Sequence, residues 1–236
     1  TISCDTFFYG LAVELGIERL TDFVRHFGFG KKSGIDIAGE VGGLLPTPEW
    51  KQRRFKQPWY MGETVIVGIG QGYTLTTPMQ LAQATAILAN KGVAMRPRLV
   101  SAAVDAKTLV TTPTPAIVSD RITLDKSNVE IVNLGMIDVT LPGGTAASVG
   151  ANAGYSIAAK TGTAQVIGIK QNEKYNEKLV NERHRDHALF VAYAPAEDPQ
   201  IALAVIVENG GHGGSAAGPI ARKVMDYYLL GKLPAV

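Results

Sequence analysis

The stretch that decides the fold is Ile157-Ala158-Ala159-Lys160-Thr161-Gly162-Thr163-Ala164-Gln165-Val166-Ile167. Apolar residues stand on both sides of a polar Lys-Thr-Gly centre, a pattern that indicates a strand. The triplet alone is weak, because most Lys-Thr-Gly triplets are turns or exposed strands without function. The rest of the chain must therefore supply the partners of a site.

A first strand is predicted over 156–169, and the sequence after it predicts further strands. Two apolar segments predict strands at 187–194 and 201–207, joined by a hairpin connection at 195–199. The polar, charged segment 170–186 is expected to be a long exposed loop that covers the groove. A final helix is predicted over 216–230, with Ile220, Val224 and Tyr227-Tyr228 facing the sheet. This part of the chain is thus an antiparallel three-strand meander followed by a helix.

The upstream part is mainly helical. Apolar periodicity and capping residues predict helices at 6–15, 18–27, 78–90 and 126–141. Residues 28–76 are expected to be rich in loops, including the basic and aromatic run 50–60 lying on the body of the domain, and 93–110 predicts short strands or hairpins. The fold class is therefore α+β, an antiparallel sheet flanked by helices, with a helical part over about 1–150 and the sheet and terminal helix over about 154–231.

Composition excludes some classes of protein. The chain has 236 residues with 23 Lys and Arg against 21 Asp and Glu, a net charge of +2 that argues against a nucleic-acid surface. Cys4 is the only cysteine, so there is no internal disulfide. No apolar run reaches the roughly 20 residues of a membrane span. Since the chain also lacks an initiator methionine, we expect it to be the C-terminal part of a longer protein.

Acyl transfer through a serine needs a nucleophile, a base, a proton route and an oxyanion hole. Four blocks carry a resemblance when taken in order: Gly68-Ile69-Gly70-Gln71-Gly72, Thr77-Pro78-Met79-Gln80-Leu81-Ala82, Lys160-Thr161-Gly162-Thr163-Ala164-Gln165 and His187–Pro195. Together they resemble the transpeptidase domain of class B penicillin-binding proteins over essentially the whole chain. Residues 3–9, 49–60 and 208–211 resemble the elongation-specific branch of that family rather than the division-specific one.

One motif of that family is absent. The resemblance implies a Ser-x-x-Lys nucleophile segment, yet none of the eight serines of this chain has a lysine three residues later. We therefore expect the nucleophile upstream of residue 1, together with a pedestal domain and a membrane helix. Residues 68–72 lack the Gly-Lys-Ser/Thr ending of a nucleotide loop, and we expect them to form a tight turn under the active site without a ligand.

The resemblance also implies roles for the strand. Lys160 presents its ammonium to the C-terminal carboxylate of the substrate, and the hydroxyls of Thr161 and Thr163 hydrogen-bond the same carboxylate. The backbone N–H of Thr163 supplies one oxyanion-hole donor. Gly162 leaves the strand bare, so that the substrate backbone can lie alongside it.

Ser3-Cys4-Asp5 stands at a loop-to-helix junction and resembles the family's Ser-x-Asn triplet, with aspartate in place of asparagine. By resemblance, Ser3 carries a proton towards the leaving group with the help of Lys160, whereas its ordinary reading is a helix N-cap. The replacement leaves the contact of Asp5 with the substrate amide open. Cys4 is either a small buried apolar residue or, by resemblance, a ligand of a structural zinc whose other ligands lie upstream. No organic cofactor is expected.

The function implied is a peptidoglycan D,D-transpeptidase that cross-links stem peptides through a serine acyl-enzyme during cell elongation and is a target of β-lactams. The implied partners are a RodA-type glycan polymerase and the MreC scaffold, with the domain in the periplasm at the inner membrane. Two alternatives stay open: a β-lactamase or D-Ala-D-Ala carboxypeptidase on the same fold, and a non-catalytic sensor or scaffold domain that binds peptidoglycan or β-lactam.

Overall fold

A three-stranded antiparallel sheet organises the computed structural model, which describes residues 2–168 and 180–233. Its strands are β5 (Ala158–Ala164), β6 (His187–Ala194) and β7 (Ile201–Val207), in that spatial order. Lys160 pairs with Val191 and Gly162 with Leu189. The predicted meander is confirmed, although β5 is shorter than 156–169. Because β6 lies between its neighbours, β5 keeps one free edge.

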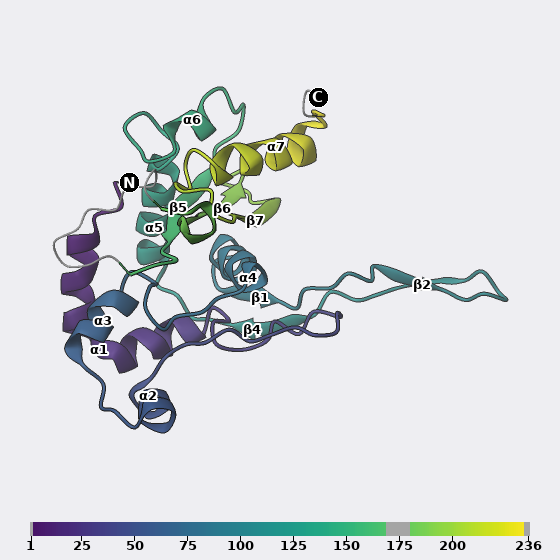
Figure 1. Cartoon of the computed structure of the whole chain (residues 1–236). Helices are drawn as coiled ribbons and strands as arrows, with labels where there is room; N and C mark the ends of the chain where they lie inside the picture. The colour runs from purple at the N-terminus through teal and green to yellow at the C-terminus, as the bar shows by residue number, and fades with distance from the viewer. Residues whose placement is uncertain (1, 169–179, 234–236) are drawn as a thin grey trace.

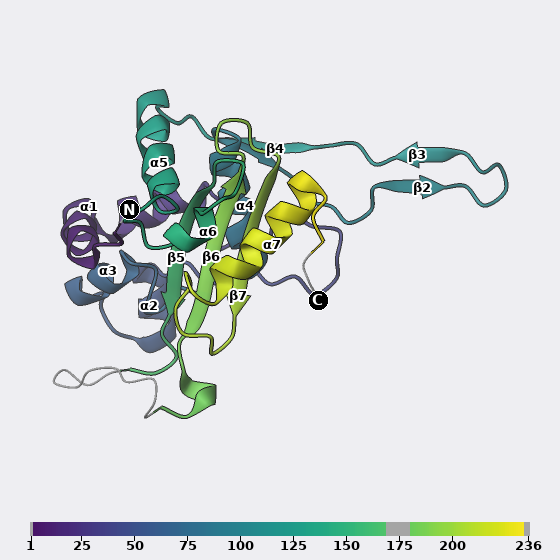
Figure 2. The ribbon, with the colours of Figure 1, turned by 90° about the horizontal axis from the view of Figure 1, so that it is seen from above.

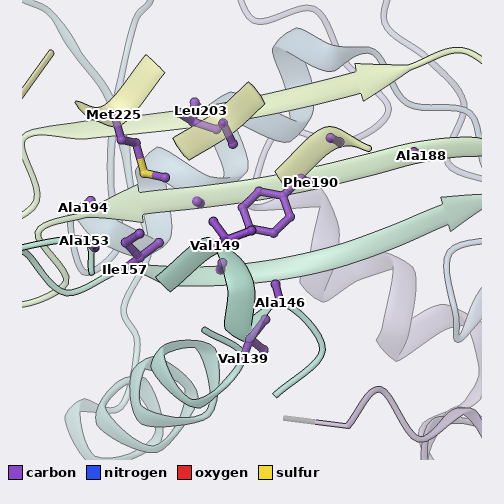
Figure 3. Packing of buried hydrophobic residues seen from close by; sticks show 14 residues of the cluster. Val139, Ala146, Val149, Ala153, Ile157, Ala188, Phe190, Ala194, Leu203 and Met225 are labelled. Carbon is purple, nitrogen blue, oxygen red and sulfur yellow. The ribbon is translucent and has the colours of Figure 1, made fainter. Parts of the chain in front are cut away.

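Helices cover both faces of this sheet, which gives three layers (Figure 2). On one face lie α6 (Ala147–Gly150) and α7 (Ala217–Leu230); on the other lie α4 (Pro78–Ala89) and α5 (Lys126–Asp138). Phe190 of β6 is fully buried at the centre of the larger core, among alanines and the side chain of Met225 (Figure 3). The many alanines of the strands let both helical layers approach closely.

The buried face of α7 differs from the prediction. Its first turns bury the small residues Ala217, Gly218 and Ala221, followed by Met225, which recur at intervals of three to four positions. The residues predicted to face the sheet, Ile220, Val224, Tyr227 and Tyr228, are 45–62% exposed. A Cβ atom at Gly218 would lie 2.7 Å from the Val149 side chain. Close approach to an alanine-rich sheet therefore selects small residues over large apolar ones.

The first predicted pair of helices forms one element, α1 (Asp5–Arg25), interrupted at Gly16 by non-helical φ and ψ of 75° and 160°. The prediction of a loop over 50–60 is wrong. The first part of this segment lies within α2 (Pro48–Phe55), which Thr47 caps by accepting the Trp50 N–H, and its end leads into α3 (Met61–Val67). Both helices lie beside α1 in the lower part of Figure 1.

The basic side chains of α2 do not all lie on the surface. Lys51 is 1% exposed, and its Nζ lies 2.5 Å from Oε1 of Glu63 in α3. The other oxygen of that carboxylate accepts the N–H of Tyr60 at 2.8 Å. This ion pair therefore holds α2 and α3 together around the chain that connects them.

Four short strands form an arm that projects from the body (Figures 1 and 2). Strand β1 (Val93–Met95) pairs with β4 (Val118–Arg121) near the body, and β2 (Ala102–Val104) pairs with β3 (Thr111–Pro113) further out. The hairpin prediction over 93–110 is confirmed, with the returning strands beyond it. At the base of the arm, the Asp36 carboxylate accepts the N–H groups of Leu99 and Val100 at 2.6 and 3.0 Å.

Most of the loop predicted over 170–186 lies outside the described residues, which end at 168 and resume at 180. Within the described part, residues 182–184 form the short 3₁₀ helix η2. Across the same described ranges, no helix combines the length and apolar composition needed to cross a bilayer.

Candidate active site

The free edge of β5 brings the predicted strand residues to one place. Successive side chains of a strand point to opposite faces, so Lys160 and Gly162 share one face and Thr161 and Thr163 the other. These four residues are half-buried or exposed, whereas Ala158 and Ala159 before them are fully buried. The site therefore wraps around the edge of the sheet, where groups from both faces can meet one ligand.

Ser3 lies against this strand although 157 positions separate it from Lys160. The Nζ of Lys160 donates a hydrogen bond to Oγ of Ser3 at 3.0 Å. Ser3 has a positive φ of 52°, a conformation that is uncommon for a residue with a side chain and typical of functional positions. The structure thus brings together two motifs that lie far apart in the sequence.

The start of α1 fixes this position in an unusual way. Cys4 takes the N-cap position and Asp5 the first turn, and no side chain caps the helix. Ser3 is therefore not the N-cap that its ordinary reading predicts. Since the exposed N–H groups of the first turn attract negative charge, Asp5 is favourably placed there.

Burial lowers the pKa of the Lys160 ammonium below its ordinary value, and the negative charge of Asp5 opposes this shift. An ammonium with a lowered pKa gives up its proton more readily. Lys160 is therefore suited both to hold an anion and to take part in proton transfer with the Ser3 hydroxyl.

Thr145 joins the site from the opposite face, and the sequence did not single it out. Its Oγ1 lies 3.2 Å from Oγ1 of Thr161. The chain reaches this point directly after the turn at Pro142-Gly143-Gly144, which was the one available signal. A Cβ atom at Gly214 would lie 2.7 Å from the Thr145 carbonyl oxygen, so the glycine-rich segment after β7 packs directly behind the two threonines.

Glycine stands at positions 213 and 162 for different reasons. A Cβ atom at Gly213 would lie 2.1 Å from the Leu189 carbonyl oxygen and 2.6 Å from that of Gly162, so only glycine fits over this backbone pair. A Cβ atom at Gly162 would meet the Leu189 Cβ at 3.3 Å, with no closer neighbour. Internal packing thus needs glycine at 213, whereas the missing side chain at 162 mainly opens the face that Lys160 shares.

Gln71 also reaches the strand, from the glycine-rich turn to which the sequence assigned no ligand. Its Nε2 donates to the Thr163 carbonyl oxygen at 2.7 Å. The N–H and C=O of one strand residue point to the same side, so the Thr163 N–H points to the free edge as well. The predicted location of residues 68–72 next to the site is confirmed.

Cys4 is exposed, which contradicts its reading as a buried apolar residue. The hydrogen bond between its Sγ and Oγ1 of Thr6, at 3.2 Å, is the main cause that lowers the pKa of the thiol. Among residues 2–168 and 180–233, no group of three or more His, Cys, Asp and Glu side chains could hold a metal ion. Zinc binding through Cys4 stays a prediction.

Taken together, one ammonium, the four hydroxyls of Ser3, Thr145, Thr161 and Thr163, and a backbone N–H surround the middle of an open strand edge. These groups can bind a carboxylate, lie along an extended peptide and donate to a carbonyl oxygen that gains negative charge. Within the chain no Ser-x-x-Lys segment accompanies them.

Comparison with known proteins agrees with this geometry. The model of the penicillin binding protein transpeptidase domain matches residues 1–226. The chain is similar to the peptidoglycan D,D-transpeptidase MrdA of Haemophilus influenzae, at 45% identity over 237 residues, and to MrdA of Escherichia coli, at 47% over 232 residues. These alignments cover 100% and 97% of the chain but 36% of each relative, so the chain spans about a third of the length of the curated relatives it matches.

Solved structures give the same result. The chain is similar to PBP2 of Pseudomonas aeruginosa, crystallised in complex with WCK 5153, with a TM-score of 0.81 and 49% identity over 98% of this chain and 47% of that one. It is also similar to PBP2 of Helicobacter pylori, solved in complex with MreC, with a TM-score of 0.77 and 32% identity over 96% of this chain and 38% of that one.

Proposed function

The chain belongs to the penicillin binding protein transpeptidase family, and from this membership we propose that it forms one wall and the proton relay of a peptidoglycan D,D-transpeptidase. The observation that carries the proposal is the 3.0 Å contact between Lys160 Nζ and Ser3 Oγ at the free edge of β5. This contact joins the two family motifs present in the chain into a single site.

In the proposed reaction, the donor stem peptide lies along β5 in an extended conformation. The hydroxyl of a serine upstream of residue 1 attacks the carbonyl carbon of the penultimate D-alanine. The peptide bond to the terminal D-alanine breaks, and the proton of the serine passes to the departing amine. An acceptor amine then attacks the ester and regenerates the serine, so that one peptide bond replaces another.

Each residue of the site has a proposed role in this sequence. Lys160, Thr161 and Thr163 bind the terminal carboxylate, which positions the scissile bond. The Thr163 N–H donates to the oxyanion, and the upstream serine's own N–H is the second donor. Ser3 passes the proton to the leaving amine, and the lowered pKa of Lys160 assists this transfer. The negative charge of Asp5 raises the pKa of Lys160 and so favours its protonated form.

The cellular setting of this activity is also a proposal. The similar proteins from H. influenzae and E. coli are named MrdA, and the similar PBP2 of H. pylori was solved with MreC. This similarity supports a role in cell elongation and shape maintenance, in the periplasm at the inner membrane, together with an MreC-type scaffold and a RodA-type polymerase.

Labelling with fluorescent penicillin tests the proposal, because β-lactams imitate the donor peptide and acylate the same serine. The full-length protein is expected to form a long-lived adduct, whereas residues 1–236 alone are expected to form none. Rapid deacylation of the full-length adduct would favour the β-lactamase alternative. Absence of any adduct, together with absence of cross-linking, would favour a binding or scaffold domain.

Zinc binding through Cys4 is proposed separately. The exposure of the thiol and its lowered pKa both favour the thiolate that binds metal. Metal analysis of the full-length protein and its Cys4→Ser variant is expected to find zinc in the first and much less in the second. Equal zinc content in both would end this proposal.

A further inference from the structure

Gln71 occupies a position on the free edge of β5 that the proposed reaction does not explain. Its carboxamide Nε2 donates to the Thr163 carbonyl oxygen at 2.7 Å, across 92 positions of sequence. The N–H of the same Thr163 is the proposed oxyanion donor and points to the same edge. A hydrogen bond that holds this carbonyl oxygen therefore restrains the backbone rotation at Thr163 and, with it, the direction of the Thr163 N–H.

The turn that carries Gln71 is built to hold this side chain. Gly70 and Gly72 on either side have positive φ values of 76° and 72°, a conformation that glycine adopts without cost. The N–H of Gln71 donates to the Ile66 carbonyl oxygen at 3.1 Å, and that of Gly70 to the Val67 oxygen at 2.8 Å. The turn thus closes on the end of α3, which leaves the Gln71 side chain directed towards β5.

Helix α3 is in turn held at both ends. At its start, the buried ion pair of Lys51 with Glu63 and the hydrogen bond from Trp59 Nε1 to Thr64 Oγ1, 2.8 Å long, tie it to α2 and the connecting chain. At its end, a Cβ atom at Gly68 would lie 2.4 Å from the Cβ of Ala12 in α1. Figure 1 shows α1 and α3 side by side. Helix α3 therefore packs against α1, the helix that begins next to Ser3, and reaches the Thr163 backbone through Gln71.

We propose that Gln71 is a positioning residue for the oxyanion hole. Its amide donor holds the Thr163 backbone so that the Thr163 N–H lies at the distance from Ser3 that acylation requires. The inference rests on the proposed function. It explains why an amide stands here, since the position needs a neutral donor. An ionised carboxylate of the same shape accepts hydrogen bonds only, and it would place a negative charge beside both the Thr163 oxygen and the developing oxyanion.

Two variants of the full-length protein test this role by single-turnover acylation with fluorescent penicillin. Gln71→Met keeps the length of the side chain and removes the donor; we expect the acylation rate constant to fall about tenfold while the dissociation constant of the preceding complex stays unchanged. Gln71→Glu is expected to lose more at pH 8 and to regain part of its rate relative to wild type at about pH 4.5, close to the ordinary glutamate pKa of about 4.3, because the protonated acid again donates.

Two controls separate this role from a general effect on the fold. Gln52→Glu adds the same charge on the exposed surface of α2 and is expected to match wild type at both pH values. Hydrogen exchange of the peptide containing residues 161–165 needs no activity, and it is expected to rise in Gln71→Met. Wild-type acylation rates and unchanged exchange in both Gln71 variants would overturn the inference. Raised exchange without any labelling of the wild type would instead contradict the proposed function.

Discussion

The candidate active site has two walls, which are held by different kinds of structure. The wall of Lys160 to Thr163 is a strand that pairs with β6 along its whole length and continues into fully buried alanines. The wall of Ser3 to Asp5 is the exposed segment that leads into α1, a helix that no side chain caps. The core thus determines the geometry of the first wall, whereas a few directed contacts determine that of the second.

This difference predicts how the two walls respond to substitution. A substitution in the core beneath the strand wall should lower the free energy of unfolding, and activity should fall as a result. A change at the helix wall should alter the chemistry at almost no cost in stability. Lys160 belongs to both classes, since it stands on the strand and donates to Ser3.

The largest expected effect is on the core beneath the strand wall. Phe190→Ala removes a ring that is 0% exposed, and the free energy of unfolding should fall by about 3–5 kcal/mol. Phe7→Ala makes the same deletion in α1 at a side chain that is 64% exposed, where we expect less than about 1 kcal/mol. Urea unfolding of both variants of the chain measures the two values. Similar losses would erase the contrast between the walls.

The second effect concerns Lys160. In the full-length protein, Lys160→Ala should slow acylation by fluorescent penicillin about 10³-fold, because it removes the cation that binds the carboxylate and assists Ser3. Its melting temperature should change little, because the side chain lies at the edge of the sheet rather than within the core. An unchanged acylation rate would remove Lys160 from the role proposed for it.

Ser3→Ala is expected to slow acylation less than Lys160→Ala does, and to leave stability almost unchanged. It removes only the hydroxyl that Lys160 contacts at 3.0 Å, so the acylation rate should fall about 10²-fold, within the usual range of acid–base contributions. Since Ser3 is exposed, the free energy of unfolding should change by less than about 0.5 kcal/mol. A loss of stability as large as that of Phe190→Ala would show that the helix wall also depends on packing.

The smallest expected effect is on the pH dependence of stability, and it concerns Asp226 in α7, behind the strand wall. Burial disfavours ionisation of Asp226, but hydrogen bonds from Arg222 and Tyr155 outweigh it and hold the pKa of this carboxyl below its ordinary value. Its contribution of about 1 kcal/mol is present above the unfolded pKa and is lost as pH falls through the folded one. Asp226→Asn should therefore reduce stability at pH 7 and have less effect in acid, as measured by thermal unfolding at both pH values.

The sequence predicted the sheet and the main helices because their apolar periods are long and regular. It missed α2 because its polar composition and flanking prolines resemble a loop, although Thr47 followed by Pro48 is a standard helix start. It assigned the wrong face to α7 because large apolar residues usually point inwards. There the strands are so rich in alanine that the small residues of the helix pack against them.

The site was predictable only in part. The roles proposed for Lys160 and Ser3 came from family motifs, but no local pattern specifies that residues 157 positions apart lie within hydrogen-bonding distance. Thr145 and Gln71 reach the strand through tertiary contacts, and neither carries a motif of its own. Glycines next to both were the only local sign that the backbone approaches something closely.

The open edge of β5 has a consequence beyond binding. An unpaired strand edge is the feature by which sheets of separate molecules join and aggregate, and most proteins cover it or place charge on it. In the proposed function, this edge has to stay accessible in order to take up a peptide. It restricts the accessible part to the length between buried Ala159 and the Gln71 side chain at Thr163, and it places the Lys160 ammonium within that length. In the proposed function, substrate binding and protection against aggregation therefore depend on the same few residues.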